Sequence, residues 1–208
     1  MPGPRIAHNL DEWKSSFTGY VKPSLYEVTF AGNGFANVFN VWRQAMNWDG
    51  EDLKQLTVMC EIASFPGEAL STQPNRIYGP VREFAYEKLY SGDLSLTFRM
   101  DSMMNMRRFF SSWQELIFES DTGDFAYYND YAGEILIYQY PTKQAESSSG
   151  GTTSLPDRRG PIYGARVTGA YPKSIGAVEL GYEQRDTYMK QTVEFAFRRW
   201  EEIHPNEL

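Results

Sequence analysis

Residues that could carry out catalysis are few in this chain. The only histidines among its 208 residues, His8 and His204, lie near the two ends of the sequence. A catalytic triad or a zinc site needs an imidazole in fixed geometry, whereas chain ends are often loosely held. The single cysteine, Cys60, lies in the apolar stretch VMCEI, which favours a buried core thiol over a nucleophile. Imidazole and thiol chemistry are therefore not predicted.

Carboxylates and glycines also lack the spacing that chemistry would need. The acidic residues between Glu119 and Asp130 do not match the ligand positions of an EF-hand loop. The glycines at 32 and 34 are not followed by the GK[ST] ending of a phosphate loop. Glu201 and Glu202 are adjacent, so they point in different directions and make a poor glycosidase pair. We therefore expect no metal, no cofactor and no enzymatic activity.

Composition limits the partners of the protein. A formal net charge of −7 argues against a duplex-binding surface, because nonspecific nucleic-acid affinity comes mainly from Lys and Arg. No apolar run reaches the ~18 residues of a transmembrane helix, and the N-terminal residues lack the apolar stretch of a signal peptide. We expect a protein without a membrane anchor that is made in the cytosol.

The most regular pattern lies between Glu61 and Asp101, which we interpret as a long two-stranded β-element interrupted by Pro and Gly. The aromatic residues of 81–90 and the apolar residues of 94–101 share even numbers, with Phe84 and Phe98 as examples. If these two arms pair in antiparallel fashion, an odd-length loop must join them. A loop of residues 91–93 satisfies this condition, with Gly92 as the hairpin turn at positive φ.

Polar residues occupy the other face of this pattern and recur in a second strand. Within residues 189–200, Val193 and Phe195 alternate with Thr192 and Glu194, as in the earlier arms. The candidate residues of the polar face are Glu83, Glu87, Ser95, Thr97, Thr192 and Glu194. From alternation alone, an ordinary solvated sheet face is the favoured explanation of these residues.

The rest of the sequence predicts two helices, several strands and the loops between them. An apolar stripe predicts a helix over about 103–119, capped by Ser102, and another over 10–17. Further predicted strands are 25–30, 56–62, 135–140, 163–170 and 177–180. The residues at 31–37 are typical of a turn, and 42–54 of a loop or short helix. The segment 143–161 is predicted to be a flexible insertion rich in Ser, Gly, Thr and Pro.

Six segments, in chain order, carry a family resemblance. They are CEIASFPGEAL, IYGPVREFAYEKLYSGDLSLTF, FFSSWQELIF, YYNDYAGEILIYQY, AYPKSIGAVELGY and TVEFAFRRW. Together they resemble the tail tube protein family of contractile-tailed bacteriophages and cover most of Leu56 to Trp200 in the family's order. The insertion at 143–161 and the long segment before Tyr26 depart from the pattern.

The resemblance implies a mainly β fold, a β-sandwich or open barrel flanked by one packed helix. It implies one tail-tube domain over 1–208, with an N-terminal segment at 1–25 and an insertion at 143–161. Subunits would form hexameric rings stacked head to tail, with hairpins joined into one barrel around a lumen. The six polar residues would line that lumen, where an acidic or neutral surface lets DNA slide without specific binding.

The resemblance also implies partners and a location. The partners are further copies of the chain and the tail sheath, baseplate and tail-terminator proteins. The location is the virion tail, assembled in the host cytoplasm. Alternatives in the same class are a baseplate protein that initiates the tube and the tube protein of a related contractile injection system. An alternative of another class is a soluble β-rich module that binds a ligand such as a carbohydrate, supported by the 15% aromatic content.

Overall fold

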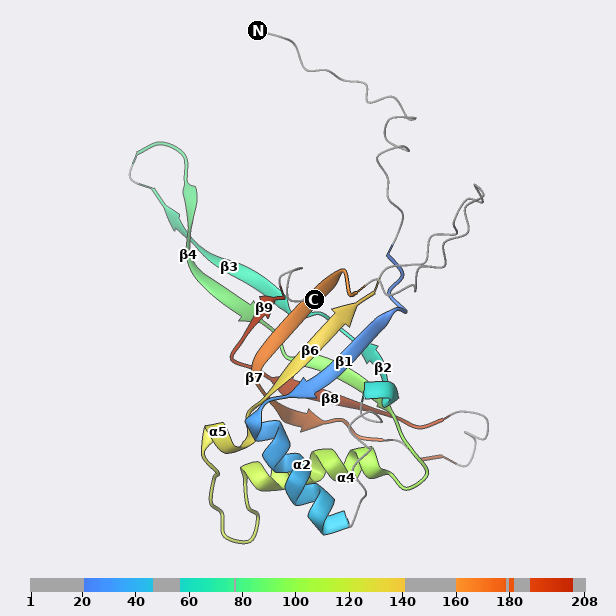
Figure 1. Cartoon of the computed structure of the whole chain (residues 1–208). Coiled ribbons are helices and arrows are strands. Elements are labelled where there is room, and N and C mark those ends of the chain that lie inside the picture. The colour runs from blue at the N-terminus through green and yellow to red at the C-terminus, as the bar shows by residue number, and fades with distance from the viewer. Residues whose placement is uncertain are drawn as a thin grey trace, which may run out of the picture.

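The computed structural model describes residues 21–46, 57–76, 78–140, 160–178, 180–181 and 188–203. The strands are β1 (Tyr26–Ala31), β2 (Cys60–Ala63), β3 (Gly67–Asn75), β4 (Arg82–Ser91), β5 (Leu94–Arg99), β6 (Gly133–Gln139), β7 (Tyr163–Ile175), β8 (Lys190–Ala196) and β9 (Arg199–Glu202). The helices are α2 (Asn33–Met46), α4 (Asn105–Ile117) and α5 (Tyr128–Tyr131). The fold is mainly β, as predicted (Figure 1).

The main sheet has seven strands in the order β1-β6-β7-β8-β5-β2, with β9 paired to β7. Strand β7 is long enough to pair with different strands along its length. Its first part pairs with β6 on one side and β9 on the other, and its last part pairs with β8. The sheet curves until its outer strands approach each other, where the Tyr26 hydroxyl donates to the Cys60 carbonyl at 3.1 Å. The result is an open barrel.

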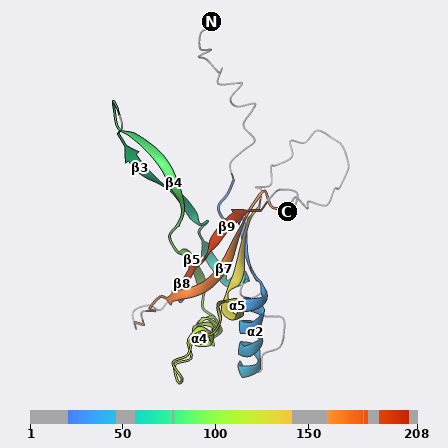
Figure 2. The same ribbon diagram turned by 90° about the vertical axis from the view of Figure 1, so that its left-hand side faces the viewer.

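A second sheet consists of β3 and β4 alone. This hairpin projects away from the main sheet and the helices (Figures 1 and 2). At its base, β3 follows β2 and β4 leads into β5, and β2 itself pairs with β5. The segment from Glu61 to Asp101 therefore contains a long two-stranded ribbon, as expected from the sequence, bent where the hairpin leaves the main sheet.

The predicted partners within that ribbon are wrong. Residues 82–91 pair with 67–75, and residues 94–99 pair with β8 and β2, so the two predicted arms do not pair with each other. The chain reverses between Asn75 and Arg82, where Gly79 and Pro80 lie. Alternation indicates which face a residue occupies, but it carries no information about the neighbouring strand.

Helix α4 covers the main sheet, as its apolar stripe predicted. Its buried apolar residues are Met106, Phe109, Phe110 and Trp113. The predicted cap is wrong, because the Asp101 carboxylate, and not Ser102, accepts from the Asn105 backbone N–H at 2.7 Å. Met104 precedes the helix in the left-handed region at φ 56°, which rotates the chain from β5 into α4.

Helix α2 occupies the stretch that the sequence indicated as a turn followed by a loop or short helix. Phe35, Val38, Phe39 and Trp42 recur at helical spacing and are buried. Gly32 does form a turn at φ 92°, but Gly34 serves close packing, since a Cβ there would lie 2.1 Å from the Ala132 carbonyl oxygen. Gly32 therefore forms the turn that precedes α2, and Gly34 allows the start of α2 to pack closely against Ala132.

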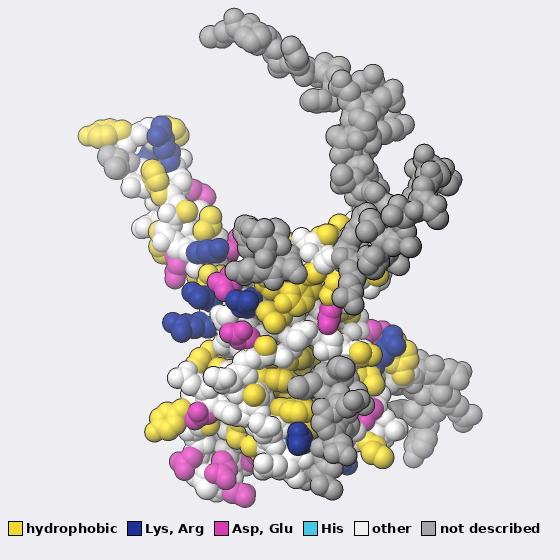
Figure 3. Space-filling view, viewed as in Figure 1, with side chains coloured by type: hydrophobic (Ala, Val, Ile, Leu, Met, Phe, Trp, Pro, Cys, Tyr) yellow, Lys and Arg dark blue, Asp and Glu magenta, His cyan; other side chains and the backbone are white. Residues whose placement is uncertain are grey.

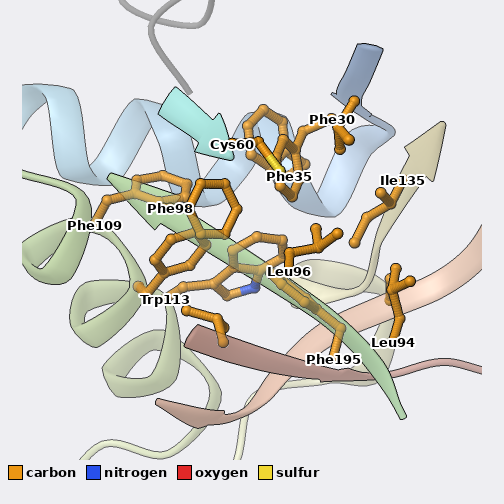
Figure 4. Packing of buried hydrophobic residues seen from close by; sticks show 14 of the residues in the cluster. Phe30, Phe35, Cys60, Leu94, Leu96, Phe98, Phe109, Trp113, Ile135 and Phe195 are labelled. Carbon is orange, nitrogen blue, oxygen red and sulfur yellow. The ribbon is translucent and has the colours of Figure 1, made fainter. Parts of the chain in front are cut away.

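Aromatic side chains build the core between the helices and the sheet (Figure 4). Phe35 from α2 lies 5.6 Å from Trp113 of α4 between ring centroids, and Phe98 from β5 lies 5.0 Å from Phe110. These are edge-on or tilted contacts, the arrangement that ring quadrupoles favour. Cys60 is also buried there, and burial raises the pKa of its thiol to about 12, as an inert core residue requires.

The remaining strand predictions divide into two groups. The predictions at 25–30, 135–140 and 163–170 correspond to β1, β6 and the first part of β7. The strand predicted at 56–62 forms only from Cys60, after a helical turn at 57–59, and the strand predicted at 177–180 is not formed at 177, 178 or 180. The predicted helix at 10–17 and nearly all of the insertion at 143–161 lie outside the described residues.

Candidate functional surfaces

One face of the β5–β8 pair carries four of the six predicted polar residues. Thr97 lies directly opposite Thr192, and Ser95 lies directly opposite Glu194. The two threonine hydroxyls are 3.1 Å apart and share a hydrogen bond. On the reverse face, Leu96, Phe98 and Phe195 are fully buried beneath α4. The alternation in the sequence thus corresponds to one buried face and one polar face of the β5–β8 pair.

The polar face continues onto the neighbouring strands. The Ser174 hydroxyl of β7 donates to the Glu194 carboxylate at 2.8 Å. On the other side, Ile62 of β2 lies opposite Thr97 and is exposed. The surface formed by β2, β5, β8 and the end of β7 is called the sheet face below. It is a continuous, mostly uncharged surface.

A charged cluster closes one end of the sheet face. Arg99 and Lys190 lie opposite each other, and both contact Glu61. Lys190 Nζ donates to the Glu61 carboxylate at 2.8 Å, Tyr188 donates at 2.8 Å, and Arg99 Nε forms a looser ion pair at 3.5 Å. The hydrogen bond from Lys190 is the largest of the effects that lower the Glu61 pKa.

The Glu61 cluster was missed by the sequence analysis. Arg99 and Lys190 share parity with the polar residues of their strands, so the same alternation could have placed them on this face. Glu61 could not have been assigned in that way, because a register irregularity separates Cys60 from Ile62 in the pairing of β2 with β5. Its carboxylate pairs with both cations and offsets one of their two positive charges.

Glu83 and Glu87 do not join the sheet face. Both belong to β4 of the projecting hairpin, where Glu83 lies opposite Pro74 and Glu87 lies opposite Ser71. The register shifts between Ser71 and Thr72, so β4 contains one extra residue there. The shift puts the two glutamates on opposite faces of the hairpin although their numbers share parity. The common face predicted for them is wrong.

Gly92 has the positive φ that was predicted, at 86°. It does not form a hairpin turn, because it joins β4 of the hairpin to β5 of the main sheet. A Cβ at this position would meet no atom within 4 Å, so backbone conformation and not crowding explains the glycine. Asp93, the next residue, accepts a hydrogen bond from Lys173 Nζ at 2.6 Å and fixes the junction to β7.

Two open hollows lie beside the strands, and the first shares Glu61 and Arg99 with the charged cluster. One, of about 560 Å³, includes Tyr26, Glu27 and Tyr140 in its lining, and the other, of about 680 Å³, includes Tyr128 and Arg198. In the first, Tyr140 donates to Glu27 at 2.6 Å, which raises the Tyr140 pKa to about 12. Its polar groups are thus paired with each other. Among the described residues, no group of three or more side chains is arranged to hold a metal ion.

The described residues combine an open, curved sheet with a buried core, a sheet face that no described element covers and a projecting hairpin. A comparison with protein families matches residues 21–203 to the family described as phage tail tube protein. The chain belongs to that family and is a structural tail component. No curated protein matches the chain, and no helix within the described part has the length and apolarity of a membrane span.

Solved structures share the fold at low sequence identity. The tube-terminating cap of the anti-feeding prophage is similar with a TM-score of 0.56 and 12% identity, over 90% of this chain and 93% of that one. A sheath/tube terminator structure of the PVC extracellular contractile injection system gives 0.55 and 10%, over 90% and 100%. A sheath–tube complex of the same system gives 0.51 and 9%, over 92% and 96%.

Proposed function

We propose that this chain is the repeated subunit of an inner tail tube, assembled as stacked hexameric rings whose lumen conducts the phage genome. The sheet face carries this proposal. Its reverse is buried under α4, whereas Thr97, Thr192 and Glu194 contact no covering element within the described part of the chain. A tube subunit needs a sheet of this kind, because one side must stabilise the fold while the other faces water in the channel.

The chemistry of the sheet face supports passage of DNA without retention. Its central side chains are hydroxyls and one carboxylate, which offer duplex phosphates no cation to bind. The two cations at its end, Arg99 and Lys190, are both paired with Glu61. Ser95, Thr97, Thr192 and Glu194 are therefore proposed to line the lumen, and Glu83 and Glu87 to lie on the hairpin that extends the channel wall.

The projecting hairpin supports assembly into rings. Strands β3 and β4 pair only with each other among the described strands, so each leaves one edge without a backbone partner. Free edges invite pairing with another chain, and closure into a ring satisfies all of them at once. Side-by-side hairpins would form the continuous barrel. The sheath, baseplate and tail-terminator proteins are the proposed partners, in a virion tail assembled in the host cytoplasm.

A second candidate in the same class is a protein that caps or initiates the tube. The observation behind it is that cap and terminator structures share this fold with TM-scores of 0.56 and 0.55, beside 0.51 for a tube complex. A tube protein of a related contractile injection system fits the same fold. Similarity at 9–12% identity supports the fold and does not separate the repeated subunit from the ends of the tube.

Electron microscopy of the purified protein, alone and with a baseplate fraction, distinguishes these candidates. The repeated subunit should form long hollow tubes of stacked rings. Single rings that do not extend would assign the chain to a cap or initiator. A monomer that stays unassembled under both conditions would contradict the tube proposal, and ligand binding by that monomer would favour the soluble module.

A further inference from the structure

The projecting hairpin carries apolar side chains that its own molecule leaves uncovered. Tyr78 at the turn is 95% exposed, and Phe84 and Tyr86 on β4 are more than half exposed. An isolated two-stranded hairpin is marginally stable in water, and clustered exposed aromatics indicate an interaction surface. The hairpin is therefore built to be covered in an assembly.

The tip of the hairpin is basic as well as apolar. Arg76 and Arg82 flank the turn, and the five residues between them include no acidic residue. Glu83, which follows Arg82 in the sequence, already accepts a hydrogen bond from the Thr72 hydroxyl at 3.2 Å. We call the segment from Arg76 to Arg82 the hairpin tip.

A surface of opposite charge lies between α4 and α5. The segment 118–127 contains Glu119, Asp121 and Asp124 and has no Lys or Arg. Within this segment, which we call the acidic loop, Phe125 and Tyr127 are 76% and 85% exposed.

The acidic loop is held in a defined shape. Phe118 and Phe125 form a β-bridge with their rings 4.8 Å apart, and the Glu119 backbone N–H donates to the Asp124 carbonyl at 3.0 Å. Gly123 closes the turn at φ 76°. The loop therefore presents its acidic and aromatic groups without first having to become ordered.

The hairpin tip and the acidic loop lie at opposite ends of the molecule. In Figure 1 the hairpin extends upward at the left, whereas the loop between α4 and α5 forms the lower end. Figure 3 shows dark blue side chains near the hairpin tip and magenta side chains gathered at the lower end. The two surfaces cannot meet within one chain, but a second copy displaced along the long axis of the molecule brings them together.

We propose that the hairpin tip of one subunit docks on the acidic loop of a subunit in the next ring. Arg76 and Arg82 pair with the carboxylates of the loop, and Tyr78 packs against its exposed aromatic rings. The contact is heterologous, with a different surface on each partner, so it repeats without closing and generates a filament. This inference rests on the proposed tube function and names the contact that stacks its rings.

Charge reversal on either side tests this contact. The tip variant carries Arg76→Glu and Arg82→Glu, and the loop variant carries Glu119→Lys, Asp121→Lys and Asp124→Lys. Each variant alone juxtaposes like charges between rings, so it should form rings but lose tubes in electron micrographs. Rings of the two variants, mixed in equal amounts, should form tubes again, because each tip then meets a loop of opposite charge.

A matched control changes the net charge without touching either surface. Arg43→Glu with Arg108→Glu alters two exposed arginines on α2 and α4, and this variant should form tubes like the unmodified chain. If the unmodified chain and both reversal variants form tubes, the docking contact is wrong while the tube function stands. If the unmodified chain forms neither rings nor tubes, the tube function itself is contradicted, and the docking contact falls with it. Tubes lost in both variants but not regained on mixing would also overturn the contact.

Discussion

Strands β4 and β5 follow each other in the chain, and both have aromatic or apolar residues at even-numbered positions. These side chains are buried in β5 and exposed in β4. In β5, the even-numbered residues Leu94, Leu96 and Phe98 are fully buried in the core. In β4, the even-numbered aromatic residues remain exposed, with Phe84 at 56%. In β5 the alternation corresponds to one buried and one polar face, whereas in β4 the register shift near Tyr86 interrupts it and no described element covers the aromatic side chains. Within the described part of the chain, the apolar side chains of β4 stay exposed, which is the basis of the proposed contact with a second copy.

Matched phenylalanine substitutions should show the largest contrast between these strands. Phe98→Ala removes a fully buried ring from β5 and should lower the free energy of unfolding by about 3–5 kcal/mol. Phe84→Ala in β4 should change it by no more than about 0.5 kcal/mol, since the ring is exposed in the isolated chain. Urea unfolding of the unassembled protein measures both. Equal losses in the two variants would show that the hairpin is packed in the monomer.

The junction between the two strands gives the next largest effect. Gly92→Val puts a β-branched residue at φ 86° and should cost about 1–2 kcal/mol of folding stability. The larger consequence should be for assembly, because a changed backbone at 92 redirects the hairpin relative to the main sheet. Electron microscopy should then show few tubes although circular dichroism remains native.

Gly79→Val is the control for the stability effect of Gly92→Val only, because Gly79 itself belongs to the hairpin tip. Gly79 also has φ 86° and open space around it, but it lies at the hairpin turn and not at the base. This variant should keep the direction of the hairpin and leave the stability of the main sheet unchanged, as measured by urea unfolding. Normal tubes from Gly92→Val would contradict the role of the junction.

Added charge distinguishes the sheet face from the hairpin as lumen lining. Thr97→Lys introduces one cation per subunit on the sheet face, so assembled tubes should retain duplex DNA at low salt and release it as salt rises. Thr72→Lys makes the same substitution on the hairpin, on the face shared with Glu83. Filter-binding assays with tubes of each variant compare the two regions. Retention by Thr72→Lys alone would move the DNA path from the sheet face to the hairpin.

Replacing Glu61, whose carboxylate pairs with Arg99 and Lys190, should give the smallest effect, which is a change in DNA binding by the tubes. Glu61→Gln leaves Arg99 and Lys190 without their shared counter-ion, so tubes should bind duplex DNA more tightly and with a steeper salt dependence. Glu201→Gln, which alters an exposed carboxylate of β9 paired with Arg166 and Arg199, should not change DNA binding. Equal DNA binding by both variants would contradict the role of Glu61 in the channel.

The same variant carries a pH test. The Glu61 pKa is lowered in the folded chain, mainly by the hydrogen bond from Lys190, so its ion pairs contribute stability above the ordinary carboxyl pKa. That contribution disappears as the pH falls through the lowered pKa. Thermal unfolding as a function of pH should therefore decline less steeply on the acid side for Glu61→Gln than for the unmodified chain. Parallel acid limbs would show that the cluster does not stabilise the fold.

Sequence reasoning succeeded where a local pattern has a single structural solution. The stripe from Met106 to Trp113 predicted α4, because apolar residues at helical spacing must face one side. It failed at residues 31–37, where the glycines suggested a turn and the structure begins α2. Gly34 is explained by the Ala132 carbonyl, which is distant in sequence and invisible to any local rule.

For this protein the sequence by itself determined which side chains share a face in strands that pair without a register shift, such as β5 and β8. Thr97 and Thr192 fall on the polar side and Phe98 and Phe195 on the buried side, because successive residues of a strand point in opposite directions. Tertiary structure decided which strands become neighbours, so β5 lies beside β8 while β4 projects with β3. It also decided that Glu83 and Glu87 lie on opposite faces, because one extra residue reverses the alternation only after the register of pairing is fixed.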